Sequence, residues 1–337
     1  MGNSSTIALP SAMKTIATIS LASSLLCAAV PHPTLAQGQA YPTKPITMVT
    51  GFPPGGISDV LARALSARLS AQMGQSVIVE NRPGAGTTIA SAYVAKAVPD
   101  GYTLLFQDMT THAINAKAYK NLPFDALNDF SLISLVASTP LMMVSSLGSG
   151  ANDVKSLVEL ARKNPGKVSY ASSGNGTIMH LAGETFKQVM KIDSLHVPYK
   201  GGAPSVQAVV AGEVTYSFLS MPPGVAQAKA GKVNALAVTT AKRVAAMPNV
   251  PTLKEQGVPV EIVLYSGLIG PKNMPPAVVA RLNEEVRKAL ESPEMKQTLA
   301  NAGADALASS PEEFARLLKA QAVEMAEAVQ LANVTLD

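Results

Sequence analysis

The sequence predicts an α/β fold whose strands form mainly parallel sheets. Strand-like and helix-like patterns alternate along most of the chain and are joined by short connections, which is typical of helices packed on parallel sheets. With 337 residues, the chain is long enough for one large or two medium domains. Because 47% of the residues are hydrophobic and 15% are charged, the chain can bury a sizeable core.

The alternation begins after an N-terminal segment of different character. Short apolar runs predict strands at 46–50, 76–79 and 102–106. Apolar residues at helical spacing predict helices over 57–73 and 88–98, between these strands.

The middle of the chain continues the alternation, and the C-terminal part departs from it. The predicted helix and strand pairs are 153–163 with 168–170, 177–190 with 194–197, 204–211 with 214–218, and 223–230 with 235–238. Three helices, each opened by a proline, then follow without intervening strands at 275–291, 293–301 and 311–332.

Two extended segments, 140–144 and 263–269, are the places where the chain is expected to cross between two lobes. We therefore predict a discontinuous first lobe, made of residues 37–142 plus 265–337. The second lobe is expected to be continuous over residues 143–264.

The first 36 residues have the order of a secretory signal peptide. Lys14 precedes an apolar and small-residue stretch over 15–30, and small residues end the segment at Ala36. We expect residues 1–36 to be cleaved after Ala36, with Ala40 as the alternative position, and the mature chain to lie in the periplasm.

Two features of this segment bear on the mature chain. Met13 offers an alternative start to Met1. The single cysteine, Cys27, falls inside the signal, and its neighbours do not form a lipidation box. The mature chain then has no disulfide, thiol nucleophile or cysteine metal site.

Composition argues against several classes of function. The net charge of +4 is scattered, without basic runs or interleaved aromatic residues, so we expect no nucleic-acid partner. The four histidines lack metal-binding spacing, so we expect neither a metal nor a cofactor.

Two Gly-rich segments are candidates for anion binding. The first, 51–59, joins a strand to a helix, where glycines admit a ligand and free amides attract anions. A tight turn capped by Ser58 or Asp59 is an equally good interpretation. The second, 170–180, places hydroxyls, an amide and glycines before a helix, which favours binding of a carboxylate. The candidate ligand-binding residues are Phe52, Pro54, Gly55, Gly56, Ser58, Asp59, Ser172, Ser173, Gly174, Asn175, Gly176 and Thr177.

Two other segments receive weaker functional interpretations. In 80–88, Arg82 is a possible carboxylate ligand, but a salt bridge with Glu80 is favoured. In 196–202, Tyr199 and Lys200 either border a cleft or form a solvated turn. A Ser–His hydrolase is disfavoured because Gly-x-Ser-x-Gly is absent, and His180 is expected to be packed and hydrogen-bonded.

These segments together resemble the Bug family, the periplasmic receptors of tripartite tricarboxylate transporters. The matching motifs cover essentially the whole mature chain and include Pro53-Pro54-Gly55-Gly56, Glu80-Asn81-Arg82-Pro83-Gly84-Ala85-Gly86, Pro99-Asp100-Gly101-Tyr102, Tyr170-Ala171-Ser172, and His196-Val197-Pro198-Tyr199-Lys200-Gly201. The resemblance implies a two-lobed, Venus-flytrap fold of the periplasmic binding protein type, closing by a hinge on a small carboxylate. It also implies that segments 52–59 and 172–177 face the ligand.

The sequence departs from the family pattern at three places. The segment 263–267 lacks the usual Trp, Gln207 replaces an Asp, and Thr215 replaces an acidic residue. We therefore expect a plain or aromatic carboxylate rather than an amino acid.

The function predicted from the resemblance is solute binding without catalysis. The chain is expected to be a monomer that captures a di-, tri- or aromatic carboxylate for the membrane subunits of a tripartite tricarboxylate-type transporter. A ligand sensor for a two-component system and, less favoured, an exported hydrolase remain as alternatives.

Overall fold

The computed structural model describes residues 41–336. The predicted signal peptide, Cys27 and the cleavage position lie outside these residues. In the described part, the strands are β1 (Ile46–Thr50), β2 (Val77–Asn81), β3 (Thr103–Asp108), β4 (Phe130–Ser146), β5 (Val168–Ser172), β6 (Ser194–Pro198), β7 (Tyr216–Ser220), β8 (Val233–Val238), β9 (Val263–Pro271) and β10 (Asp305–Ala306).

The helices follow the predicted alternation closely. They are α1 (Ile57–Met73), α2 (Thr88–Ala95), α3 (Met109–Ala118), α4 (Val154–Lys163), α5 (Ile178–Met190), α6 (Gly202–Ala211), α7 (Met221–Lys229), α8 (Pro276–Glu291), α9 (Pro293–Asn301) and α10 (Pro311–Leu331). The bounds of α1 agree with the prediction because a Pro-Gly turn precedes the helix and Gly74, in the left-handed conformation, ends it. None of the helices within residues 41–336 has the length and apolar character needed to cross a membrane.

The strands form one mixed sheet with the order β2-β1-β3-β9-β4-β7-β5-β6, and β8 and β10 also pair with β4. Two groups are parallel, β2-β1-β3 and β7-β5-β6. The predicted α/β class with parallel strands is confirmed, and β4 and β9 add antiparallel pairs to it. These two strands are antiparallel to each other, β4 is antiparallel to β7, and β9 is antiparallel to β3. Two parallel strands must be joined by a long crossover connection, usually a helix. β4 and β9 instead pair antiparallel and link the two parallel groups directly.

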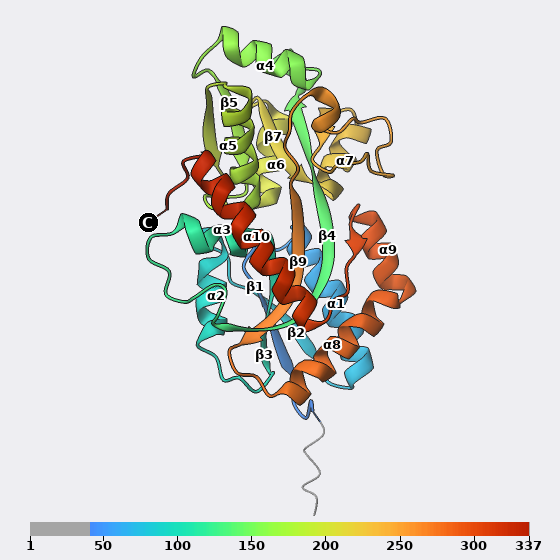
Figure 1. The fold of residues 1–337 in the computed structure, drawn as a ribbon. Helices are drawn as coiled ribbons and strands as arrows, with labels where there is room; N and C mark the ends of the chain where they lie inside the picture. The colour runs from blue at the N-terminus through green and yellow to red at the C-terminus, as the bar shows by residue number, and fades with distance from the viewer. Residues whose placement is uncertain (1–40, 337) are drawn as a thin grey trace, which may run out of the picture. The chain divides into compact units, whose positions relative to one another are not determined.

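The long strands β4 and β9 lie side by side in Figure 1. Their pairing runs from Phe130 opposite Pro271 to Pro140 opposite Val263. The two segments expected to cross between lobes, 140–144 and 263–269, thus fall within this pair of strands. The lobe boundaries at 142/143 and 264/265 remain a prediction.

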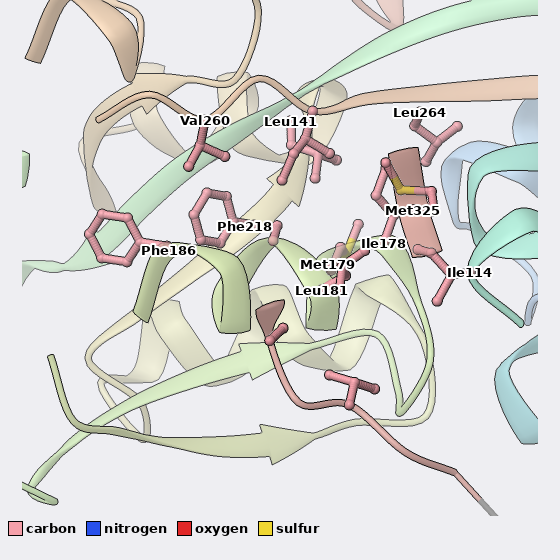
Figure 2. Packing of buried hydrophobic residues seen from close by; sticks show 14 of the residues in the cluster. Ile114, Leu141, Ile178, Met179, Leu181, Phe186, Phe218, Val260, Leu264 and Met325 are labelled. Carbon is pink, nitrogen blue, oxygen red and sulfur yellow. The ribbon is translucent and has the colours of Figure 1, made fainter. Parts of the chain in front are cut away.

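The C-terminal helix α10 packs against α3, α5 and β4. Figure 2 shows Met325 of α10 beside Ile178 of α5 and Ile114 of α3, all within one buried apolar cluster. Because α5 directly follows the Gly-rich segment 172–177, this packing fixes the position of that segment relative to α3.

Helix α3 was not predicted from the sequence. Eight of its ten residues are buried, so the helix lacks the polar face that reveals a helical period. Its start did carry a signal, because Asp108 caps it by accepting hydrogen bonds from the backbone N–H groups of Thr110 and Thr111, each 3.0 Å long.

Candidate ligand-binding cleft

A cavity of about 760 Å³ lies where strand ends and helix starts meet. Its lining includes residues at or just beyond the ends of β1, β3, β5, β6 and β7, and Leu264 of β9 closes part of the wall. The carboxyl ends of parallel strands are the usual ligand-binding edge of an α/β sheet. The volume lies in the range of small-molecule sites.

A second cavity of about 770 Å³ adjoins the first one. The two share Phe52, Pro53, Ser173, Lys200 and Gly201 as lining residues. The second cavity extends toward the segment 83–87 and the C-terminal Leu336, which are absent from the first.

Both predicted Gly-rich segments contribute to this region. The first cavity is lined by Phe52, Pro54, Gly55, Gly56, Ser58 and Ser173. The second is lined by Phe52, Ser173, Gly174, Asn175 and Thr177. Asp59, Ser172 and Gly176 line neither cavity. The structure therefore brings the two segments to one place, and contact of each residue with a ligand stays a prediction.

Asp59 holds the first segment in shape. Its carboxylate accepts hydrogen bonds from the Gly55 N–H (3.0 Å), Arg63 Nε (3.0 Å) and Asn81 Nδ2 (2.8 Å). Burial alone would raise the pKa of Asp59, but these donors, with the charge of Arg63, hold it below its usual value. Asn81 Nδ2 also donates to the Phe52 carbonyl (2.9 Å), so the same network fixes both sides of the turn.

The second segment is fixed by its own side chains. Thr177 Oγ1 donates to the Gly174 carbonyl (2.8 Å) and accepts from Ser173 Oγ (3.1 Å). The Gly176 N–H donates to Nδ1 of His180, one turn into α5, over 3.2 Å. Gly176 has a φ of +74°, which favours glycine.

A stack of aromatic rings, in which Tyr170 and His180 are buried, packs next to this segment. The rings of His180 and His196 are stacked with centroids 4.0 Å apart, and Tyr170 stacks on His196 at 4.8 Å. Burial lowers the pKa of His196 to about 3 and also lowers the pKa of His180, so both rings are neutral near pH 7. His180 is thus packed and hydrogen-bonded, as predicted.

The same stack bears on the hydrolase alternative. Ser172 Oγ lies 2.7 Å from His196 Nε2 and accepts from the Gly174 N–H (3.2 Å). Ser172 is fully buried and lines neither cavity. A nucleophile must reach its substrate, so this Ser–His contact is better explained as structural. Among the described residues, no group of three potential metal-ligating side chains is present.

Three helices begin at the first cavity without a side-chain cap. The N-cap residues are Gly56 of α1, Gly201 of α6 and Ser220 of α7, and all three line the cavity. The first N–H groups of a helix have no partner within it and carry partial positive charge. Pro222 and Pro223 remove two of these N–H groups from the first turn of α7. The starts of α1 and α6 are therefore the ones that suit the cavity to an anion.

The charged side chains on the wall of the first cavity are few. Lys200, which the sequence placed either at a cleft or in a turn, is exposed and borders both cavities. Asp108 also lines the first cavity but is fully buried, and burial raises its pKa to about 6. Asp108 and distant wall residues such as Leu264 and Asn301 were missed, because their segments come together only in the folded chain.

Arg82 forms the salt bridge that was favoured over a role as a carboxylate ligand. Its guanidinium forms a salt bridge with Glu80 (2.7 Å) and lies 3.6 Å over the Tyr93 ring. Arg82 does not line either of the two cavities.

Two groups of parallel strands joined by β4 and β9, with a cavity at the strand ends, define a solute-binding protein of the two-lobed periplasmic type. Residues 61–333 match the family described as "Tripartite tricarboxylate transporter family receptor" (TctC). The chain belongs to this Bug/TctC family, which is a family of periplasmic solute-binding receptors and not of enzymes.

Similar sequences support this assignment. The UPF0065 protein in the tcbD-tcbE intergenic region of Pseudomonas sp. (strain P51) is 38% identical over 284 residues, covering 84% of each chain. BugT of Bordetella pertussis is 32% identical over 275 residues, covering 81% of this chain and 84% of BugT.

Solved structures agree with the fold. R. palustris Rpa4515 with adipate has a TM-score of 0.84 and 32% identity, covering 88% of this chain and 99% of Rpa4515. The periplasmic binding protein BugD has a TM-score of 0.82 and 32% identity, with the same coverage. MatC (Rpa3494) from Rhodopseudomonas palustris with bound malate has a TM-score of 0.81 and 28% identity, covering 86% of this chain and all of MatC.

Proposed function

We propose that this chain captures a small carboxylate in the first cavity and delivers it to the membrane subunits of a tripartite tricarboxylate-type transporter. The observation that carries the proposal is the meeting of two uncapped helix starts with free N–H groups, at Gly56 and Gly201, on one cavity. Backbone N–H groups and the hydroxyl of Ser58 supply hydrogen bonds that a carboxylate accepts. The complexes of Rpa4515 with adipate and MatC with malate support this ligand class.

The proposed function requires export of the chain to the periplasm, where the chain loses residues 1–36. There it acts as a monomer without catalysis. Lobes 37–142 plus 265–337 and 143–264 close on the ligand by bending β4 and β9.

A thermal-shift screen of the chain from Gln37 tests the binding role. The panel contains di-, tri- and aromatic carboxylates and acidic amino acids. A ligand that binds only the folded state stabilises it by about 2.7 kcal/mol at a hundred times its dissociation constant. At least one carboxylate should give a saturable rise in Tm.

The matched variants are Gly202→Leu and Gly148→Leu. Both glycines have an ordinary φ and no heavy atom within 4 Å of an added Cβ, but only Gly202 lines the cavity. We expect the Tm rise to be lost in Gly202→Leu and kept in Gly148→Leu. Gly176 is a poorer choice because an added Cβ would meet Leu336 at 2.5 Å. A screen without any shift, or a full shift in Gly202→Leu, would contradict the proposal.

A further inference from the structure

The inner wall of the first cavity is apolar. Ile57, Ile178, Met179, Val206 and Leu264 all line the cavity, although each is at most 9% exposed. They come from α1, α5, α6 and β9. A ligand that fills this space must bury its own surface against hydrocarbon.

The lining of the first cavity offers no free carboxylate to a cation. Lys200 and Asp108 are the charged residues among the described lining of this cavity. Asp108 is fully buried and its carboxylate already accepts hydrogen bonds from the N–H groups of Thr110 and Thr111 and from the Thr111 hydroxyl. An ammonium group placed inside would therefore be desolvated without a free carboxylate to pair with.

Apart from Asp108, the buried polar side chains that line the cavity are hydroxyls, and the amides of Gln207, Gln227 and Asn301 line it from more exposed positions. Ser58, Ser173 and Ser220 are each at most 9% exposed and line the cavity. They lie at or near strand ends and helix starts, where the uncapped N–H groups also lie. The lining of the cavity therefore combines N–H groups that can bind a carboxylate with apolar side chains that can contact a hydrocarbon body.

We propose that the ligand is a carboxylate with an unsubstituted hydrocarbon body, aliphatic or aromatic, held against Ile57, Met179, Val206 and Leu264. This inference rests on the proposed function and narrows its ligand class. Met179 acts as a specificity residue, since its flexible thioether can follow bodies of different shape.

Homologous series of ligands give the first test. Burial of one methylene contributes about 0.8 kcal/mol, which is about fourfold in affinity. We expect the dissociation constant, measured by titration calorimetry, to fall about fourfold per added methylene within one series. The two series are butanoate to heptanoate and succinate to pimelate, each of constant charge. A 2-amino analogue, such as glutamate against glutarate, should bind roughly tenfold more weakly or worse.

The outcomes separate this inference from the proposed function. An affinity that is flat or falls with chain length, or an amino analogue that binds as tightly as its parent, overturns the hydrocarbon body while carboxylate binding stands. No binding by any member of either series, together with no Tm shift from any carboxylate of the thermal-shift panel, overturns the inference and the proposed function alike.

A pair of variants tests the wall itself. In Met179→Gln, the gain in affinity per added methylene should fall to twofold or less, because a polar amide replaces the apolar thioether. Met190→Gln lies on the same helix but does not line the cavity, and it should keep the wild-type gain. An unchanged gain in Met179→Gln would remove Met179 from the specificity role. The wild-type series alone decides the ligand class if Met179→Gln fails to fold.

Discussion

Replacing Gly183 by Ala tests how firmly the stack beneath the second segment is held. Gly183 lies in the interior of α5, and an added Cβ would meet Tyr170 Cε2 at 2.1 Å and Cζ at 2.4 Å. Carbon atoms in contact lie about 3.5–4.0 Å apart, so the ring would have to retreat by more than about 1 Å.

The tyrosine ring has little freedom to retreat. It stacks on His196 at 4.8 Å and on Tyr216 at 5.4 Å. Its hydroxyl donates to Glu184 Oε1 over 2.7 Å. Helix α5 would therefore have to move away from β5, and with it the segment that includes Ser173.

The magnitude follows from two opposing effects. Overpacking a core by a methyl group costs about 1–3 kcal/mol, and Gly to Ala in a helix returns up to about 1 kcal/mol. Because the ring is held on both faces, we expect the upper part of the overpacking range and a net loss of about 1–2 kcal/mol in the free energy of unfolding.

Urea unfolding and thermal melting measure this loss. Each kcal/mol lowers Tm by about 2–4 °C in a chain of this size. Gly148→Ala, which adds its Cβ to open space, should melt with the parent. If Gly183→Ala were as stable as the parent, the rigid contact between α5 and Tyr170 would be refuted.

The remaining predictions concern pH and the first segment. Burial lowers the pKa of His196 to about 3 and of His112 to about 4, below the value of about 6.5 in an unfolded chain. The unfolded state then binds more protons below pH 6.5, so urea midpoints should be highest above that pH and decrease toward pH 4. The raised pKa of Asp108 acts in the opposite sense, and a midpoint that rises on acidification would contradict the dominance of the histidines. Asp59→Ala leaves the donors on Gly55, Arg63 and Asn81 without their carboxylate. It should lower the free energy of unfolding by about 2–3 kcal/mol and weaken ligand binding, whereas Asp193→Ala, at an exposed position just before β6, should change neither.

Local sequence signals predicted those elements whose period or turn chemistry is local. Helix α1 has a Pro-Gly turn before it and a glycine after it, and the prediction matched both ends. Of β4, the extended segment recognised from the sequence was 140–144. Most of this strand is buried, so the period-two alternation that reveals a half-exposed strand is absent.

In the site, too, the parts with local sequence signals were predictable. Segments 51–59 and 170–180 carry glycines and hydroxyls in a pattern that marks a strand-to-helix connection. Their meeting, and the far wall formed by residues such as Leu264, depends on the pairing of β4 with β9. That pairing joins segments more than a hundred residues apart, and no local spacing encodes it.

The helix cap that Asp108 forms explains where in the cavity the carboxylate is expected to bind. Helix α3 also starts at the first cavity, but its own N-cap carboxylate already occupies its first N–H groups. The chain thus fills the start of α3 with an internal anion and leaves the starts of α1 and α6, which have free N–H groups, without side-chain caps. Like charges in a desolvated site repel, so an incoming carboxylate is directed away from Asp108 and toward the starts of α1 and α6. The apolar wall residues then receive the part of the ligand that carries no charge.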